Sequence, residues 1–169
     1  MAKKARGADG AAVPTTAATV ALRAAGIPFA GHVYVHDSAV TDFGAEAARE
    51  LGVAAERVFK TLMVDTDAGL GIGILSVRDQ LDVKALASAL GAKRAAMADK
   101  AVAERKSGYV VGGISPVGQK TPLPTLLDES ALKFATIFVS GGRRGFDIEL
   151  APEDLLRAVS GRAAVIRRG

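Results

Sequence analysis

The sequence predicts a single α/β domain of the α+β type, in which a mixed, curled, barrel-like sheet is surrounded by helices. Segments with helical and with strand periodicity alternate along the 169 residues. Several strand segments are joined by tight turns instead of helices, which favours mixed pairing over a purely parallel sheet. Apolar residues make up 49% of the chain, enough for one sizeable core, and no repeat or internal linker divides it.

The composition indicates where the domain begins and excludes several classes of function. Residues 1–14 are rich in Ala, Gly and Lys and predict a flexible basic tail, so the domain itself is expected over residues 15–169. No secretory leader and no run of about 18 apolar residues is recognisable, so neither export nor a membrane span is expected. The chain has no Cys, which excludes disulfides and thiolate metal sites and fits a cytoplasmic protein. A net charge of +4 is compatible with a polyanionic partner.

Capping residues and turn glycines delimit the elements expected in the N-terminal half. Thr16 and Asp42 are the expected N-caps of two helices. Gly52 ends the second helix, and residues 67–69 form a hairpin turn. The expected elements are a helix from residue 15 or 16 to about 25, a strand over 29–36, a helix over 43–51, and strands over 58–65 and 70–77.

The C-terminal half follows the same logic. Asp82 is an expected N-cap, and Pro152 suits the first turn of the last helix. The expected elements are helices over 82–90, 100–106 and 153–159, a glycine-rich loop over 108–116, and strands over 123–128, 136–140, 146–150 and 164–167.

Lys60 is the most unusual residue of the expected strands. By alternation its side chain shares a face with Val58, Leu62 and Val64. A lysine on an apolar strand face is uncommon unless it is paired or functional. Pattern alone favours a lysine that extends to solvent from an edge strand, and a functional lysine is the alternative.

Tyr34 lies between His32 and His36 on the expected strand over 29–36, so alternation places the three side chains on one face. They could line a pocket. A metal site would need a third ligand, and no Cys is present to supply it. A solvated sheet face is the favoured interpretation, and no metal site is predicted.

The segment 112–121 is only superficially similar to a nucleotide-binding phosphate loop. In such a loop a Lys directly follows the second Gly, whereas Gln119 intervenes here. Pro116 removes a backbone N–H, and Pro122 and Pro124 prevent the helix that should face the phosphate. A glycine-rich turn remains possible, as does a loop whose backbone closes over a small ligand.

The segment 140–145 joins two expected strands through several glycines. Arg143 and Arg144 could contact phosphates there, and a solvated hairpin turn is an equal alternative. Neither a Ser/His/Asp triad nor a carboxylate pair is recognisable. The residues alone therefore predict an α/β domain with a mild preference for polyanions and one unusual lysine.

Six segments, in this order, resemble the YbaK branch of the YbaK/ProX aminoacyl-tRNA editing-domain family. The resemblance extends from about residue 15 to the C-terminus, and the two glycine-rich stretches are specific to the family when taken together. The matching segments are 36–37, 43–44, 58–62, 97–99, 107–120 and 134–145.

The resemblance implies a set of site residues, with no metal and no cofactor. Lys60 occupies the position of the family's functional lysine. Tyr34, Phe43 and Thr61 fall at pocket positions. The remaining implied positions are a loop near the substrate, formed by Gly112, Gly113, Ile114, Ser115 and Pro116, and an opposite wall that includes Ser140 and Gly142.

The resemblance also implies an activity: trans-editing hydrolysis of mischarged Cys-tRNA(Pro), with tRNA(Pro) and prolyl-tRNA synthetase as partners. The expected reaction uses the substrate's own thiol to attack its ester, with Lys60 acting as a cation and the backbone N–H groups of Gly112 and Gly113 as oxyanion donors. Two alternatives remain: an Ala-tRNA(Pro) deacylase that uses water, and a non-catalytic tRNA- or nucleotide-binding module.

Overall fold

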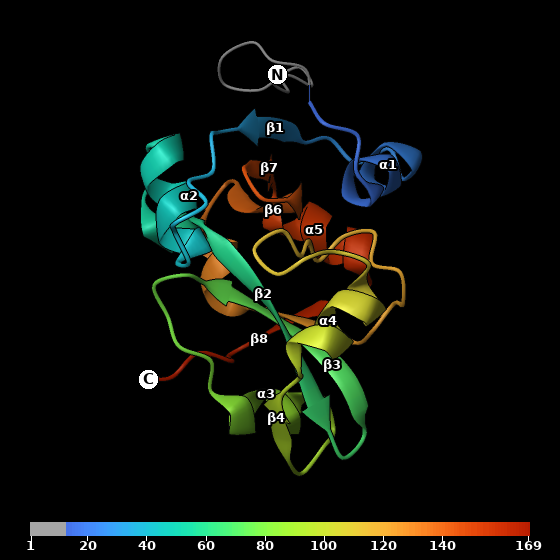
Figure 1. The fold of residues 1–169 in the computed structure, drawn as a ribbon. Coiled ribbons are helices and arrows are strands. Elements are labelled where there is room, and N and C mark those ends of the chain that lie inside the picture. Colours follow the sequence, from blue (N-terminus) through green and yellow to red (C-terminus); the bar gives the residue numbers. More distant parts are fainter. Residues whose placement is uncertain (1–12) are drawn as a thin grey trace.

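The computed structural model describes residues 13–169, so most of the predicted tail (1–14) lies outside the described residues. Figure 1 shows helices arranged around two sheets. The elements are α1 Ala17–Ala24, β1 Ala30–Val33, α2 Phe43–Leu51, η1 Ala55–Arg57, β2 Phe59–Thr66, β3 Gly69–Ser76, α3 Val83–Ala89, β4 Ala95–Met97, α4 Lys100–Ser107, β5 Thr125–Asp128, η2 Glu129–Lys133, β6 Ile137–Arg143, β7 Phe146–Leu150, α5 Pro152–Val159 and β8 Arg162–Ala164.

Three N-caps are those that the sequence predicts. The side chains of Thr16, Asp42 and Asp82 each accept a hydrogen bond from a backbone N–H in the first turn of their helix. Gly52 ends α2 with a φ of 68°, a left-handed conformation that favours glycine. These local signals explain why the bounds of α1, α2 and α3 agree closely with the predicted ones.

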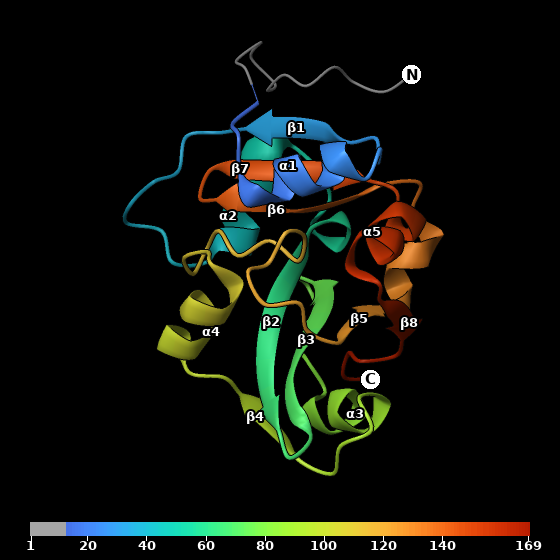
Figure 2. The same cartoon turned by 90° about the vertical axis from the view of Figure 1, so that its right-hand side faces the viewer.

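The larger sheet has the strand order β4-β2-β3-β5-β8 and combines two kinds of pairing. β2 and β3 form the predicted antiparallel hairpin, whereas β3 with β5 and β5 with β8 are parallel. The prediction of a mixed α/β domain is therefore confirmed. Figure 2 shows the β2–β3 hairpin extending from the middle of the molecule to the end at which α3 and β4 lie.

The smaller sheet is antiparallel, has the order β1-β7-β6, and lies at the other end of the hairpin (Figure 2). One isolated bridge, between Val58 and Phe138, connects it to the start of β2. The strands thus form two sheets joined at this point. A shared core fills the space between them, with Ile72 and Leu127 from the larger sheet and Val139 and Ile148 from the smaller.

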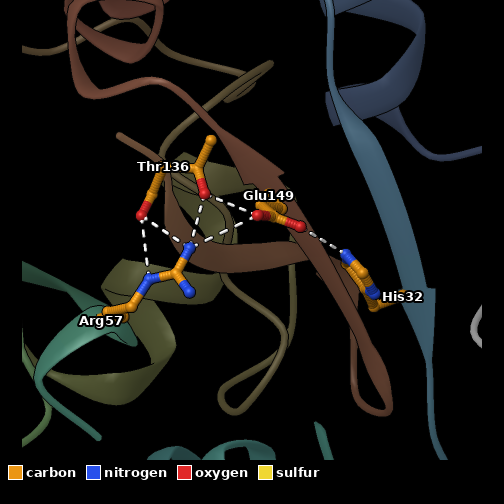
Figure 3. Close-up of polar contacts among 4 residues, drawn as sticks. All are labelled: His32, Arg57, Thr136 and Glu149. Atoms are coloured by element: carbon orange, nitrogen blue, oxygen red, sulfur yellow. Dashed lines mark hydrogen bonds and ion pairs between the residues drawn. The ribbon is translucent and has the colours of Figure 1, made fainter. Parts of the chain in front are cut away.

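A polar network at the junction of the sheets fixes their relative position (Figure 3). Arg57 donates to the carbonyl oxygen of Thr136 at 3.0 Å and approaches the carboxylate of Glu149 at 3.4 Å. Glu149 also accepts from Thr136 Oγ1 at 2.5 Å and pairs with His32 Nε2 at 2.9 Å. The Phe138 ring is contacted by both His32 and Arg57, with 5.3 Å between the rings and 5.0 Å to the guanidinium. The start of β2 is thereby held against β6 and β7.

The structure differs from the predicted elements in a few places. β1 ends at Val33; Tyr34 N–H still bonds to Gly145 O, after which the chain leaves the sheet, and Val35 is 86% exposed. His32 and His36 consequently do not share a strand face. β6 continues to Arg143 through an irregular register, which shortens the predicted turn to two residues. β4, η1 and η2 were not predicted from the sequence, and β8 lies earlier than expected.

Among residues 13–169, no helix is both long enough and apolar enough to cross a membrane.

Candidate functional site

A cavity of about 440 Å³ opens where the two sheets meet, a volume in the range of small-molecule sites. Its walls come from β2, the segment around the start of α2, the start of α4, the loop that follows α4, and β6 and β7. Seven of the residues implied by the family resemblance line it: Tyr34, Phe43, Lys60, Thr61, Gly112, Ile114 and Ser140.

Lys60 lies half-buried on the wall that β2 contributes. β4 pairs with β2 only at residues 64–66, so the strand edge beside Lys60 is not covered by β4. The ammonium donates one hydrogen bond to Asp79 O at 2.8 Å, which leaves further protons available. Burial lowers the pKa of Lys60, while the negative charges of Asp42 and Asp79 oppose that change. The lysine can therefore present a partly desolvated cation to a ligand.

Asp147, which was not predicted as a site residue, also lines the cavity. It lies on β7 opposite Ser140 and is 5% exposed. Within the described part of the chain no hydrogen bond to its carboxylate is found. Burial raises the pKa of Asp147 to about 7. A carboxyl group with such a pKa can both accept and donate a proton near neutral pH.

Tyr34 and Thr61 also line the cavity. The pKa of Tyr34 is raised, first by burial and then by the negative charge of Asp147, so its phenol stays protonated. Thr61 Oγ1 is buried, and no partner for it occurs among residues 13–169. The Tyr34 phenol can therefore donate a hydrogen bond to a bound ligand.

The loop after α4 presents its backbone to the cavity at Gly112, which has a φ of 91°. A Cβ at this position would lie 2.8 Å from the Phe43 ring, so only glycine fits. Gly113 differs, because its N–H already donates to Val110 O at 2.8 Å. Of the two N–H groups expected as oxyanion donors, the one of Gly113 thus has a backbone partner in this structure, and the one of Gly112 remains the candidate.

Four of the implied residues lie behind the cavity wall instead of lining it. A Cβ on Gly113 would meet the backbone of Arg143 at 2.7 Å, and one on Gly142 would meet Tyr109 at 2.9 Å. Ser115 is fully buried and accepts from the N–H of Val117. Pro116 is also buried. These residues shape the loop through packing and turn geometry.

The segment that carries Tyr34 toward α2 is fixed by a His–Glu pair. His36 Nδ1 lies 2.7 Å from Glu46 Oε1, and the N–H of Asp37 donates to the other carboxylate oxygen at 2.8 Å. Burial alone would raise the pKa of Glu46, but these hydrogen bonds outweigh it and lower the pKa. The His36 ring lies 5.6 Å from that of Phe43, so the pair also supports a cavity wall.

The residues around the cavity suit an organic ligand. No cluster of three or more His, Asp or Glu side chains capable of holding a metal ion occurs in the described part of the chain. The polar side chains that line the cavity carry an ammonium, a carboxyl group and hydroxyls, and Gly112 contributes backbone. This combination can bind an ester, stabilise negative charge on its carbonyl oxygen and transfer a proton.

Known proteins resemble the chain in sequence. EbsC of Enterococcus faecalis, provisionally named a Cys-tRNA(Pro)/Cys-tRNA(Cys) deacylase, is 41% identical over 120 residues, which are 70% of this chain and 73% of EbsC. The proline–tRNA ligase of Shouchella clausii is 43% identical over 76 residues, which are 44% of this chain and 13% of the ligase.

Solved structures share the fold. One, provisionally described as a trans-editing enzyme for prolyl-tRNA synthetase, has a TM-score of 0.79 and 25% identity and covers 92% of this chain and 99% of its own. The hypothetical protein APE2540 has a TM-score of 0.82 and 24% identity, with coverages of 90% and 100%. The family model for the aminoacyl-tRNA editing domain matches residues 37–158, more than half of the chain. The resemblance noted in the sequence is therefore confirmed, and this protein belongs to the aminoacyl-tRNA editing domain family of YbaK type.

Proposed function

We propose that this protein is a trans-editing deacylase that removes cysteine from mischarged tRNA(Pro). The observation that carries the proposal is the cavity, in which Lys60, Asp147 and the backbone of Gly112 meet in a chain of the editing-domain family. The name of the EbsC relative supports Cys-tRNA(Pro) as the substrate. The similarity to part of a proline–tRNA ligase supports prolyl-tRNA synthetase as a functional partner.

The substrate's own thiol is the proposed nucleophile. Its sulfur bonds to the ester carbonyl carbon, the bond from that carbon to the ribose oxygen of the terminal adenosine breaks, and that oxygen leaves with a proton. The thiol loses one proton, so the products are a cyclic thiolactone and free tRNA, and no water is consumed. Holding the thiol close to the carbonyl is worth up to about 7–11 kcal/mol in ideal intramolecular reactions.

Three residues of the cavity would stabilise charge, transfer the proton and bind the oxyanion. Lys60, as a half-buried cation, would orient the terminal nucleotide or offset negative charge near the ester. Asp147 is suited to carry the proton from the thiol to the leaving oxygen, because its pKa of about 7 lies close to neutral pH. The N–H of Gly112 is the candidate oxyanion donor.

Selectivity would follow from the same chemistry. Serine and cysteine are similar in size, and a pocket alone separates such pairs poorly. A thiol is a much better nucleophile than a hydroxyl at neutral pH. A site that depends on substrate-thiol attack should therefore spare Ser-tRNA even if it binds.

The test is deacylation of Cys-, Ala- and Ser-charged tRNA(Pro) by the purified protein and its Lys60→Ala variant. We expect fast loss of cysteine alone. We expect Lys60→Ala to abolish most of this turnover without unfolding the protein. Lys84→Ala is a matched control, because Lys84 lies exposed on α3 and does not line the cavity.

Other outcomes of this deacylation assay would contradict the proposed substrate, nucleophile or role of Lys60. Preference for alanine would indicate an Ala-tRNA(Pro) deacylase that uses water. Equal rates on Ser- and Cys-tRNA would also indicate attack by water. Tight tRNA binding without turnover of any substrate would indicate a binding module, and full activity of a folded Lys60→Ala variant would remove Lys60 from the mechanism.

A further inference from the structure

Two charged side chains from different elements hold the backbone of Val111, the residue before Gly112. Glu104, on α4, accepts a hydrogen bond from Val111 N–H at 2.8 Å. Arg144, in the turn between β6 and β7, donates through Nε to Val111 O at 2.9 Å. Hydrogen bonds to charged partners are stronger than those between neutral groups. The backbone N–H and C=O of Val111 are thus both fixed by such bonds.

The bond from Arg144 also fixes the orientation of Gly112 N–H. Val111 O and Gly112 N–H belong to one peptide group, and that peptide is trans. The N–H must therefore point opposite to the carbonyl that Arg144 holds. No partner for this N–H occurs among the described residues, and Gly112 lines the cavity. A free donor of fixed direction is thereby placed beside the candidate site.

Arg144 is itself held in place by the cavity wall. Its guanidinium lies over the Phe43 ring, 5.1 Å from the ring centre. A Cβ on Gly112 would lie 2.9 Å from Arg144 Nε, so loop and guanidinium are in close contact. A cation bound to the carbonyl also polarises the peptide group and strengthens its N–H as a donor.

We propose that Arg144 and Glu104 are positioning residues that aim and strengthen the Gly112 N–H as the oxyanion donor for the substrate ester. The inference rests on the proposed function, since it requires an ester bound in the cavity. Arg144 acts through the Val111–Gly112 peptide and not through a contact with tRNA.

Single-turnover deacylation of Cys-tRNA(Pro) by excess enzyme tests this role, because it separates the rate of reaction from tRNA binding. Arg144→Met keeps an apolar chain beside Phe43 and removes the donor. A complete oxyanion donor contributes about 10²–10³-fold, and we expect a loss of roughly 10–100-fold in the rate constant at saturating enzyme. The enzyme concentration that gives half the maximal rate should not change.

Arg144→Lys retains a cation and should recover part of the rate. Arg23→Met is the matched control, because Arg23 is also exposed and lies over a phenylalanine, Phe29, at 5.5 Å, but is outside the cavity. It should react like the wild type. If Arg144→Met instead raised the half-saturating concentration and left the maximal rate unchanged, Arg144 would be a tRNA-binding residue and the inference would be overturned.

Glu104 supplies an independent check. Glu104→Gln keeps an oxygen that can accept Val111 N–H and should retain most of the rate, whereas Glu104→Ala should lose it. Glu104 and Arg144 hold the two peptide groups that flank Val111. If both side chains act by fixing this one residue, Glu104→Ala combined with Arg144→Met should cost less than the sum of the single effects. Additive losses would contradict action through Val111. An inactive wild type would refute the proposed function, whereas an active wild type with an equally active Arg144→Met would refute this inference alone.

Discussion

Two buried aspartates of this protein have opposite surroundings. Asp128, at the end of β5, is fully buried, and its carboxylate accepts from the N–H groups of Ser130, Ile166 and Arg167 and from the Arg167 guanidinium at 2.9 Å. Asp147, on β7, is 5% exposed, and no hydrogen bond to it is found among residues 13–169. One carboxylate ties the C-terminal segment to the larger sheet, and the other faces the cavity without a partner.

The difference shows in the two pKa values. Burial would raise the pKa of Asp128, but hydrogen bonds from Ser130, Ile166 and Arg167 outweigh it and lower the pKa. Nothing offsets burial at Asp147, whose pKa rises to about 7. A buried group with satisfied partners stabilises a fold, whereas one held without partners in a cavity is typical of a functional site.

Removing the carboxylate at the cavity should give the largest effect. We expect Asp147→Asn to lower the deacylation rate by about 10²–10⁴-fold, the usual contribution of a proton-transferring group. Asp128→Asn, which changes the partnered carboxylate in the same way, should keep its activity per folded molecule. Rates divided by the folded fraction from circular dichroism provide the measurement. Wild-type-like turnover by Asp147→Asn would show that the unpartnered aspartate has no role in the chemistry.

For the free energy of unfolding, the partnered Asp128 should matter more than a carboxylate on the surface. Asp128→Ala leaves buried N–H groups without an acceptor and frees the C-terminal segment from β5, so we expect a loss of about 3 kcal/mol in the free energy of unfolding. Urea unfolding measures it. Asp154→Ala serves as the matched control, since Asp154 pairs with Arg157 on the surface of α5 at 2.8 Å and such pairs contribute about 0–1 kcal/mol. Equal losses in the two variants would mean that the network around Asp128 adds nothing beyond a surface pair.

Local signals made much of the fold predictable. The caps Asp42 and Gly52 act on residues within one or two turns, and the β2–β3 hairpin is specified by its own turn residues. β4 could not be predicted in this way, because its three residues have no strand pattern and are ordered by pairing with the end of β2. The end of β1 at Val33 likewise depends on a distant segment, since its partner strand β7 begins at Phe146.

The candidate site was predictable only in part. Lys60 was noticeable because a lysine interrupts an apolar strand, and family resemblance placed six further residues that line the cavity. No signal in the sequence distinguishes Asp147 from Glu149, since both alternate with apolar residues on β7. Packing separates them, because Asp147 faces the cavity whereas Glu149 is paired with Arg57 and His32. Contacts between distant segments, which alternation does not encode, therefore decide the chemistry.

A subtler prediction concerns the cost of keeping Asp147 buried. An exposed aspartate releases its proton near pH 4, whereas Asp147 in the folded protein does so at about pH 7. Between these values the folded state binds one more proton than the unfolded state, so this group makes stability fall as pH rises from about 4 to 7 and leaves a constant cost above that. Asp147→Asn removes the titration. We expect it to unfold with a free energy higher by about 4 kcal/mol at pH 8, with the gain shrinking toward pH 4.

Urea unfolding of wild type and Asp147→Asn between pH 4 and pH 8 measures this dependence. Asp128→Asn supplies the opposite sign, because a carboxyl group with a lowered pKa stabilises the fold above its unfolded pKa and loses that contribution as the pH falls. A gain that grows with pH at position 147 and a loss at position 128 would mean that the protein gives up stability at the cavity to keep a carboxyl group ready for proton transfer. Parallel curves for wild type and Asp147→Asn would instead mean that Asp147 is ionised and compensated in the folded state, and its proposed proton transfer would then lack a physical basis.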